Sequence, residues 1–297
     1  MSASTVTRRA HTDSSPGQAS SMAGPASHAR SLRAGLMLAG REWKRFFRQR
    51  HRVIAAVVQP LLFWLLFGTG LRSSFAGVAG QGFLEYFLPG TVALILLFTA
   101  IFATISVIED RREGFLQGVL VAPVSRWSVL IGKILGGGAI AWVQAVAFLC
   151  LIWAVGQAPI GPSMIPLLGL LFLMAAGMVA LGMVVAWPMD STQGFHAIMN
   201  LVLMPLWLLS GSFFPIPADS GSLGWGQSLL AGVMKLNPLS YGMAELRRLL
   251  YPAIDYGALG WVPDRTTAWL VTAGWLAGMI VWAAWLMRNP ARVDAQG

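Results

Sequence analysis

Five charged residues in a row occupy positions 109–113 of a chain that is otherwise almost free of charge between residues 53 and 187. Only four other acidic or basic side chains occur in that stretch. Charges of both signs can orient and pair with a protein surface, and residues 114–126, which follow, read as a short amphipathic helix stopped by Pro123. We therefore expect a loop that is presented in water to a partner. The run itself is Glu109, Asp110, Arg111, Arg112 and Glu113.

The composition shows what surrounds this loop. Hydrophobic residues make up 56% of the 297 positions and charged residues 11%, whereas soluble domains carry about 25% charged residues. We predict an all-α integral membrane protein, because the apolar runs are long enough for spanning helices of about 20 residues. Six spans are expected, at residues 53–71, 87–108, 130–155, 164–187, 195–213 and 267–287.

The distribution of Lys and Arg predicts the orientation. With the N-terminus inside, the inner side carries sixteen of the 21 basic residues: ten before residue 53, four in 109–133 and two after residue 287. Five remain outside, so the positive-inside rule places both termini and the charged loop in the cytoplasm. The net charge of +9 is explained by this rule, and we expect no nucleic-acid partner.

The region before the first span has two parts. Residues 1–31 are rich in Ser, Ala, Thr and Pro and are expected to form a disordered cytoplasmic tail, as are residues 288–297 at the other end. Residues 32–52 predict an amphipathic helix lying in the membrane interface, with basic residues toward lipid phosphates. The alternative is a charge cluster that only fixes topology. Leu32, Leu36, Trp43 and Phe47 share one face, and Arg41, Lys44, Arg45, Arg48 and Arg52 share the other.

Several chemistries are disfavoured by what the chain does not contain. There is no G-x-x-x-x-G-K-[ST] loop, so no ATP site is assigned to this chain. The single cysteine, Cys150, excludes an intrachain disulfide. Ser210 or Ser212 with His196 would lie near opposite ends of one span, which rules out a hydrolytic dyad. The predicted spans hold almost no ionisable side chains, which disfavours ion-coupled transport.

Two further features concern helix packing and the outer side. Gly132 and Gly136 in the third span, and Gly274 and Gly278 in the sixth, have the spacing that lets helices approach closely. Residues 214–266 are moderately apolar but are interrupted by an Asn-Pro pair, so we expect a short re-entrant hairpin or outer interfacial helices before the last span. A seventh span is the less favoured alternative.

Three segments resemble the permease subunit of ABC-2 type exporters. Residues 113–126 read EGFLQGVLVAPVSR and are similar to the conserved stretch after the second span of that family. Residues 205–216, PLWLLSGSFFPI, resemble the end of its fifth span, and residues 236–243, LNPLSYGM, its N-P-x-x-Y segment. The resemblance covers residues 32–287. Phe115 departs from it, since a small polar residue is usual there.

The resemblance implies a half-transporter, not itself an enzyme, that pairs with a second permease copy or a related chain and with a separate ATP-binding subunit. ATP and Mg²⁺ would bind that subunit, and this chain would bind no cofactor. The loop after span two would be the coupling helix, and the amphipathic N-terminal helix a second contact. The residues implied for coupling are Glu113, Gly114, Phe115, Leu116, Leu120, Pro123 and Arg126; for the interfacial helix, Trp43, Lys44, Arg45, Phe47 and Arg48; for the outer gate, Asn237, Pro238 and Tyr241.

The predicted function is therefore a permease that exports a hydrophobic, amphipathic or lipid-linked substrate across the inner membrane. The alternative is a membrane scaffold that recruits a cytoplasmic protein through residues 109–126 without transporting anything. Within the loop, Glu113 and the apolar face behind it are expected to carry the coupling. Residues 110–112 are expected to do no more than hold the loop in water.

Overall fold

The computed structural model describes residues 25–70, 83–115, 118, 125–156, 163–218, 224–254 and 260–288, and these residues are helical with short connections. Six helices are long and apolar enough to cross a membrane, at Val53–Gly70, Phe83–Arg112, Arg126–Ala154, Met164–Ala186, Thr192–Ser212 and Arg265–Arg288. The predicted all-α membrane class with six spans is thus confirmed. The helices in chain order are α1 (Pro25–Arg48), α2 (Arg50–Gly70), α3 (Phe83–Arg112), α5 (Arg126–Ala154), α6 (Met164–Ala186), α7 (Thr192–Trp207), α8 (Trp225–Leu236), α9 (Pro238–Leu250) and α10 (Arg265–Arg288).

Helix α3 is the centre of the bundle. The apolar residues of α3 are almost entirely buried, and the helix packs against α2, α5 and α6. Small residues bring the neighbouring backbones close: a Cβ atom at Gly137 of α5 would lie 2.9 Å from the Cβ of Ala103, and one at Gly182 of α6 would lie 2.7 Å from Thr104. By contrast, α2 and α10 expose most of their apolar surface, which is available to lipid or to another chain.

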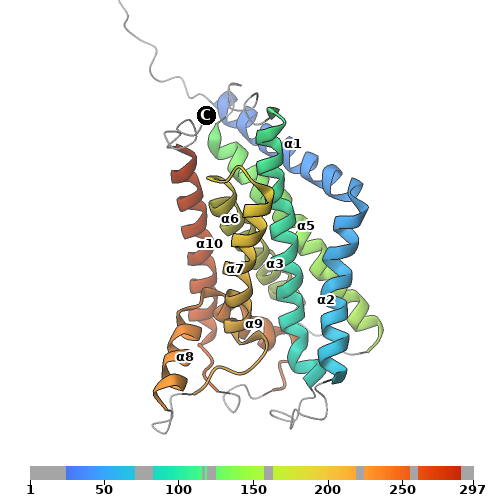
Figure 1. The fold of residues 1–297 in the computed structure, drawn as a ribbon, viewed down its shortest axis with the longest axis vertical. Helices are drawn as coiled ribbons and strands as arrows, with labels where there is room; N and C mark the ends of the chain where they lie inside the picture. Colours follow the sequence, from blue (N-terminus) through green and yellow to red (C-terminus); the bar gives the residue numbers. More distant parts are fainter. Residues whose placement is uncertain are drawn as a thin grey trace, which may run out of the picture.

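The two ends of the bundle carry different short helices. Helix α1 lies across the end at which α3 and α10 finish, whereas α8 and α9 lie at the opposite end (Figure 1). Helix α1 begins at Pro25, inside the stretch expected to be a tail, and it ends at Arg48, where a break at Gln49 separates it from α2. The two ends therefore offer two separate candidate sites.

Candidate functional site

The position of α1 is set by close packing against α5. A Cβ atom at Gly132 would lie 2.6 Å from the carbonyl oxygen of Gly35, and one at Gly136 would lie 2.9 Å from the Cα of Ala39. Small residues at both contacts let the two backbones touch, as in small-xxx-small helix pairs. The predicted close approach at Gly132 and Gly136 is confirmed, and the helix that approaches is the N-terminal one.

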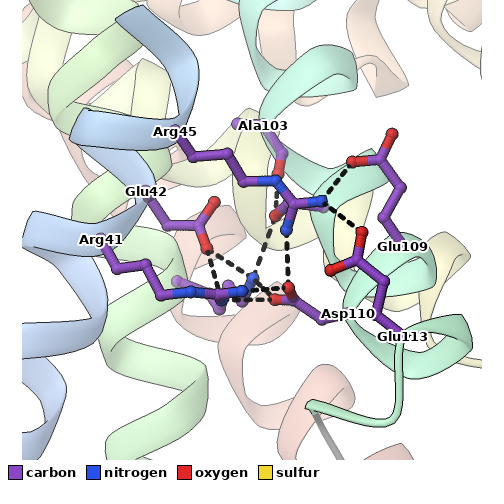
Figure 2. Close-up of polar contacts among 9 residues, drawn as sticks. Arg41, Glu42, Arg45, Ala103, Glu109, Asp110 and Glu113 are labelled. Carbon is purple, nitrogen blue, oxygen red and sulfur yellow. Dashed lines mark hydrogen bonds and ion pairs between the residues drawn. The ribbon is translucent and has the colours of Figure 1, made fainter. Parts of the chain in front are cut away.

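Asp110 is the centre of a buried ion network formed where α1 crosses α3 and α5. Its side chain is fully buried. It accepts hydrogen bonds from Arg41 Nη2 at 2.8 Å, Arg45 Nη1 at 2.6 Å and Lys133 Nζ at 2.5 Å. Figure 2 shows the two arginines reaching from α1 toward carboxylates on α3. One carboxylate thus joins three helices.

Further carboxylates complete the network. Lys133 Nζ also donates to Glu42 Oε1 at 2.6 Å and to the hydroxyl of Ser106 at 3.0 Å. Arg45 also donates to Glu109 at 2.8 Å and lies 3.5 Å from the carboxylate of Glu113. Buried charges are costly unless each is paired and hydrogen-bonded, and here every one has a partner.

Arg41 is the outermost cation of this ion network and remains charged. The hydrogen bond that it donates to Asp110 raises the pKa of its guanidinium, despite the opposing effect of burial. Its guanidinium also lies 3.7 Å from the centre of the Phe115 ring, in a cation–π contact. Phe115, which follows the turn at the end of α3, is therefore attached to α1.

The expectation for residues 110–112 is wrong. Asp110 is buried in the network, and Arg111 donates to the carbonyl oxygens of Trp187 at 2.5 Å and Met189 at 3.2 Å. Arg112 Nε donates to the carbonyl of Asp190 at 2.9 Å. The carbonyls at and beyond the end of α6 need donors, and these two arginines supply them. The charged run therefore fastens α3 to α1, α5 and the α6–α7 turn.

The predicted coupling residues begin where α3 ends. The Glu113 side chain is 61% exposed, and Gly114 adopts a left-handed conformation (φ 73°) that ends the helix. Phe115 is held by Arg41, as described above. Leu116, Leu120 and Pro123 lie outside the described residues. Contact of these three residues with an ATPase stays a prediction, and so does that of Glu113, Gly114 and Phe115.

Arg126 lies at the start of α5 and has an internal partner. Its Nη1 donates to the carbonyl oxygen of Met287 at 2.5 Å and lies 3.4 Å from that of Arg288. These carbonyls end α10, so Arg126 caps that helix and complements its dipole. Arg126 therefore has a structural role, and its contact with an ATPase stays a prediction.

The residues predicted for the interfacial helix divide into two groups. Lys44, Phe47 and Arg48 are exposed, and the Phe47 ring lies 5.4 Å from the Trp43 ring, tilted by 41° to it. Arg45 instead points into the ion network. The signal that was missed is the pair Arg41 and Arg45, four residues apart on one face of α1, which faces Asp110, 69 and 65 positions away.

At the opposite end, the predicted gate residues lie at the turn between α8 and α9. Asn237 caps α9, accepting from the amide of Leu239 at 3.0 Å, and Pro238 occupies the first helical position. The Tyr241 ring lies 5.5 Å from that of Trp261. A fully buried acid on α9, Glu245, was not predicted from the sequence.

Glu245 fastens α9 to the start of α10. It lies 3.2 Å from Arg248 and 3.0 Å from Arg265, and it accepts from Trp269 Nε1 at 3.3 Å. A buried acid on a helix with two nearby arginines is the signal that could have found this contact.

Comparison with known families decides the class of the protein. The family model described as ABC-2 type transporter matches residues 34–251, which is more than half of the chain. The chain belongs to the ABC-2 type transporter family. The match contains the whole ion network and α9, and it stops before α10.

Relatives of this ABC-2 chain are transport permeases. It is similar to the transport permease ycf38 of Cyanophora paradoxa, with 27% identity over 214 residues, 69% of this chain and 71% of the relative. The daunorubicin resistance ABC transporter permease protein DrrB1 of Streptomyces coeruleorubidus is 25% identical over 230 residues, 74% of this chain and 77% of the relative. The multidrug ABC transporter permease YbhR of Escherichia coli is 27% identical over 133 residues, which are 44% of this chain and 36% of the relative.

The ABC-2 membership gives the ion network its context. The chain is a multi-pass membrane protein of a permease family, and its relatives are transporters rather than enzymes. Among the residues that the structure describes, no cluster of three or more His, Cys, Asp or Glu side chains is arranged to hold a metal ion. The described polar chemistry at the α1 end is therefore electrostatic attachment between helices.

Proposed function

We propose that this ABC-2 chain is the permease subunit of an ATP-driven exporter in the inner membrane, with both termini in the cytoplasm. ATP and Mg²⁺ bind a separate ATP-binding subunit, which docks on the loop after α3. The observation that carries this proposal is the buried ion network at the base of that loop. It attaches the loop to three helices at once.

The network suits the loop for transmitting force. Glu113 follows Asp110 by about one helical turn, so a load applied to the loop reaches Asp110 directly. Asp110 shares that load with Arg41 and Arg45 on α1 and with Lys133 on α5. A loop joined to a single helix by the backbone alone would bend, whereas this one moves α1, α3 and α5 together.

The chemistry of the spans supports an apolar or amphipathic cargo. The described parts of the spans carry their charges near the helix ends, and the exposed surfaces of α2 and α10 are apolar. Two relatives bear names that refer to daunorubicin resistance and to multiple drugs. We therefore propose a hydrophobic, amphipathic or lipid-linked substrate, moved outward.

A second permease, either another copy or a related chain, completes the proposed transporter. Helix α2 exposes Ile54, Val58, Leu62 and Leu66, which line a shallow apolar groove. One protomer also leaves most of α10 uncovered. Surfaces of this extent are suited to lipid and to a partner permease.

The test is ATP-dependent transport by the chain co-purified with its ATPase and placed in proteoliposomes. Glu113→Ala and Asp110→Asn should each lower substrate-stimulated ATP turnover and transport by about tenfold, because they loosen the loop or its anchor. Glu85→Gln, an exposed acid at the other end of α3, is the matched control and should change neither.

The proposal and its alternative give different results. If no nucleotide-binding protein associates with the chain, or if the loop variants leave ATP turnover unchanged, the exporter function is wrong. Association of some other cytoplasmic protein, lost on Glu113→Ala, would favour the scaffold alternative instead.

A further inference from the structure

The fifth span ends in a broken helix. Helix α7 contains Pro205 near its end and continues as a π-helical turn, Leu208–Ser212, in which Gly211 is left-handed with φ 78°. The carbonyls in the last turn of any helix have no partner within that helix. In a membrane protein they must find donors elsewhere, because lipid offers none.

Side chains of α9 donate to the end of this span. Asn237 Nδ2 donates to the carbonyl oxygen of Leu206 at 2.6 Å, and Arg247 Nη2 donates to that of Gly211 at 2.5 Å. Ser240 Oγ lies 3.3 Å from the carbonyl of Leu209 but only 2.6 Å from that of Met234, so its one proton serves the nearer oxygen. Asn237 and Arg247 are therefore the two firm attachments, ten residues apart on α9.

Arg247 makes the attachment at the point where three helices meet. Its guanidinium lies 3.9 Å from the centre of the Tyr86 ring on α3, and the hydroxyl of Tyr86 donates to the same Gly211 carbonyl at 3.2 Å. A cation at the C-terminal end of a helix is also favoured by the helix dipole. Arg247 thus joins α9 to the broken end of α7 and to the start of α3.

The end of α7 is fitted closely to α3 as well. Trp207 Nε1 donates to the carbonyl of Gly90 at 2.8 Å, and a Cβ atom at Gly90 would lie 2.8 Å from the carbonyl oxygen of Ser212. The cavity beside Arg247 has a volume of only about 40 Å³. Ligand pockets usually measure about 300–1,000 Å³, so this cavity is too small for a drug-sized ligand.

We propose that Arg247 is a positioning residue for transport: it makes α9 and the broken end of α7 move as one body at the outer end. This inference rests on the proposed function. If α9 moved alone as a lid, the hydrogen bond from the guanidinium of Arg247 to the Gly211 carbonyl would break. Opening instead moves the joined α7–α9 unit against its neighbours.

The chain offers matched variants. Arg247→Gln removes the cation at the joint, and Arg247→Lys restores the charge without the planar guanidinium. Arg265→Gln is the control, because Arg265 also contacts α9, through Glu245, but its side chain is 64% exposed and does not reach α7. Amide hydrogen exchange of residues 206–216 and 238–250 is measured on the full chain in lipid nanodiscs, and transport per ATP hydrolysed is measured with the ATPase present.

The amide exchange of both segments and the transport per ATP hydrolysed should change together in the Arg247 variants. In Arg247→Gln, exchange should rise by about tenfold in both segments together, and transport per ATP should fall several-fold, with Arg247→Lys intermediate. Arg265→Gln should leave both segments and the transport ratio close to wild type. A merely structural role for Arg247 would not change the transport ratio.

Other outcomes overturn the inference. Faster exchange in 238–250 alone would show that α9 is a separate lid, and joint exchange with an unchanged transport ratio would remove the role in transport. If wild type shows no ATP-dependent transport, the proposed function fails. The exchange measurement, which needs no ATPase, then still decides whether α9 and the end of α7 form one body.

Discussion

The contacts that hold α1 against α3 differ in kind from those that hold α9 against the end of α7. At the α1 end, charged side chains pair with one another, and Arg45 has three carboxylates within 3.5 Å. At the α9 end, Asn237 and Arg247 donate to single backbone carbonyls. An ion network can exchange partners while it stays paired, whereas a carbonyl cap is either made or lost. The first arrangement tolerates rearrangement under load, and the second fixes a helix end in place.

The largest effect should follow from breaking the centre of the ion network. Asp110→Asn leaves Lys133 and two arginines without their shared carboxylate, and uncompensated buried charges are strongly destabilising. We expect the free energy of unfolding in mixed micelles to fall by about 3 kcal/mol. Glu113→Gln, at the exposed edge of the same network, should change it by less than about 0.5 kcal/mol. Equal losses in the two variants would show that burial of Asp110 does not matter.

A second variant separates packing from charge at the same end. Gly132→Ala places a methyl group against the backbone of Gly35, 2.6 Å from its carbonyl oxygen. We expect a loss of about 2 kcal/mol, because neither backbone can give way without moving α1. The control is Gly274→Ala in α10, where the added carbon meets nothing within 4 Å among the described residues. If Gly132→Ala is as stable as the control, charge alone holds α1.

At the α9 end, Asn237→Ala removes two hydrogen bonds, one that caps a carbonyl of α7 and one that caps the first turn of α9. The side chain caps α9 and also donates to Leu206. The expected loss is about 1.5 kcal/mol in the unfolding free energy, measured by denaturant titration. Asn200→Ala, an exposed amide in α7, serves as the comparison and should be neutral. A neutral Asn237→Ala would mean that water replaces the amide at no cost.

The smallest effect concerns an exposed cap at the start of α10. Asp264 accepts from the hydroxyl of Thr267 at 2.6 Å and from its amide at 2.9 Å, and these bonds lower the pKa of the carboxyl below its ordinary value. A lowered pKa means that the contribution is present above the ordinary pKa and is lost as pH falls through the folded value. Asp264→Ala should therefore lower the melting temperature slightly at pH 7 and not at all at strongly acidic pH. A difference that persists in acid would contradict this assignment.

The sequence predicted some parts of this structure well and others not at all. Length and apolarity were enough for the six spans, because each span is a local property of about 20 residues. The ion network joins Arg41, Asp110 and Lys133, which are far apart in the sequence, so no local pattern reveals it. Lys133 was nevertheless a signal: a lone cation between two glycines in an apolar run requires a buried acid nearby.

At the α9 end, too, contacts between distant residues could not be predicted from the sequence. The segment around Gly211 was recognised by resemblance, and the Asn-Pro pair, predicted only to interrupt the apolar stretch, lies where α9 begins. Which carbonyls Asn237 and Arg247 would serve depends on the break in α7, and a π-helical turn has no reliable sequence signature. The role of Arg247 therefore emerged only from the arrangement of three helices.

Helix α3 makes the two ends mechanically dependent on each other. From Gly90, where α7 is seated, to Asp110, the chain has no proline and no further glycine, and at 1.5 Å per residue this stretch is about 30 Å long. This uninterrupted stretch of helix is long enough to cross the full apolar thickness of a bilayer. A displacement of α3 along its axis at the Asp110 end would therefore reach Gly90, where an added Cβ atom would lie only 2.8 Å from the carbonyl oxygen of Ser212. In the proposed transporter, movement of the loop after α3 would thus displace the end of the fifth span.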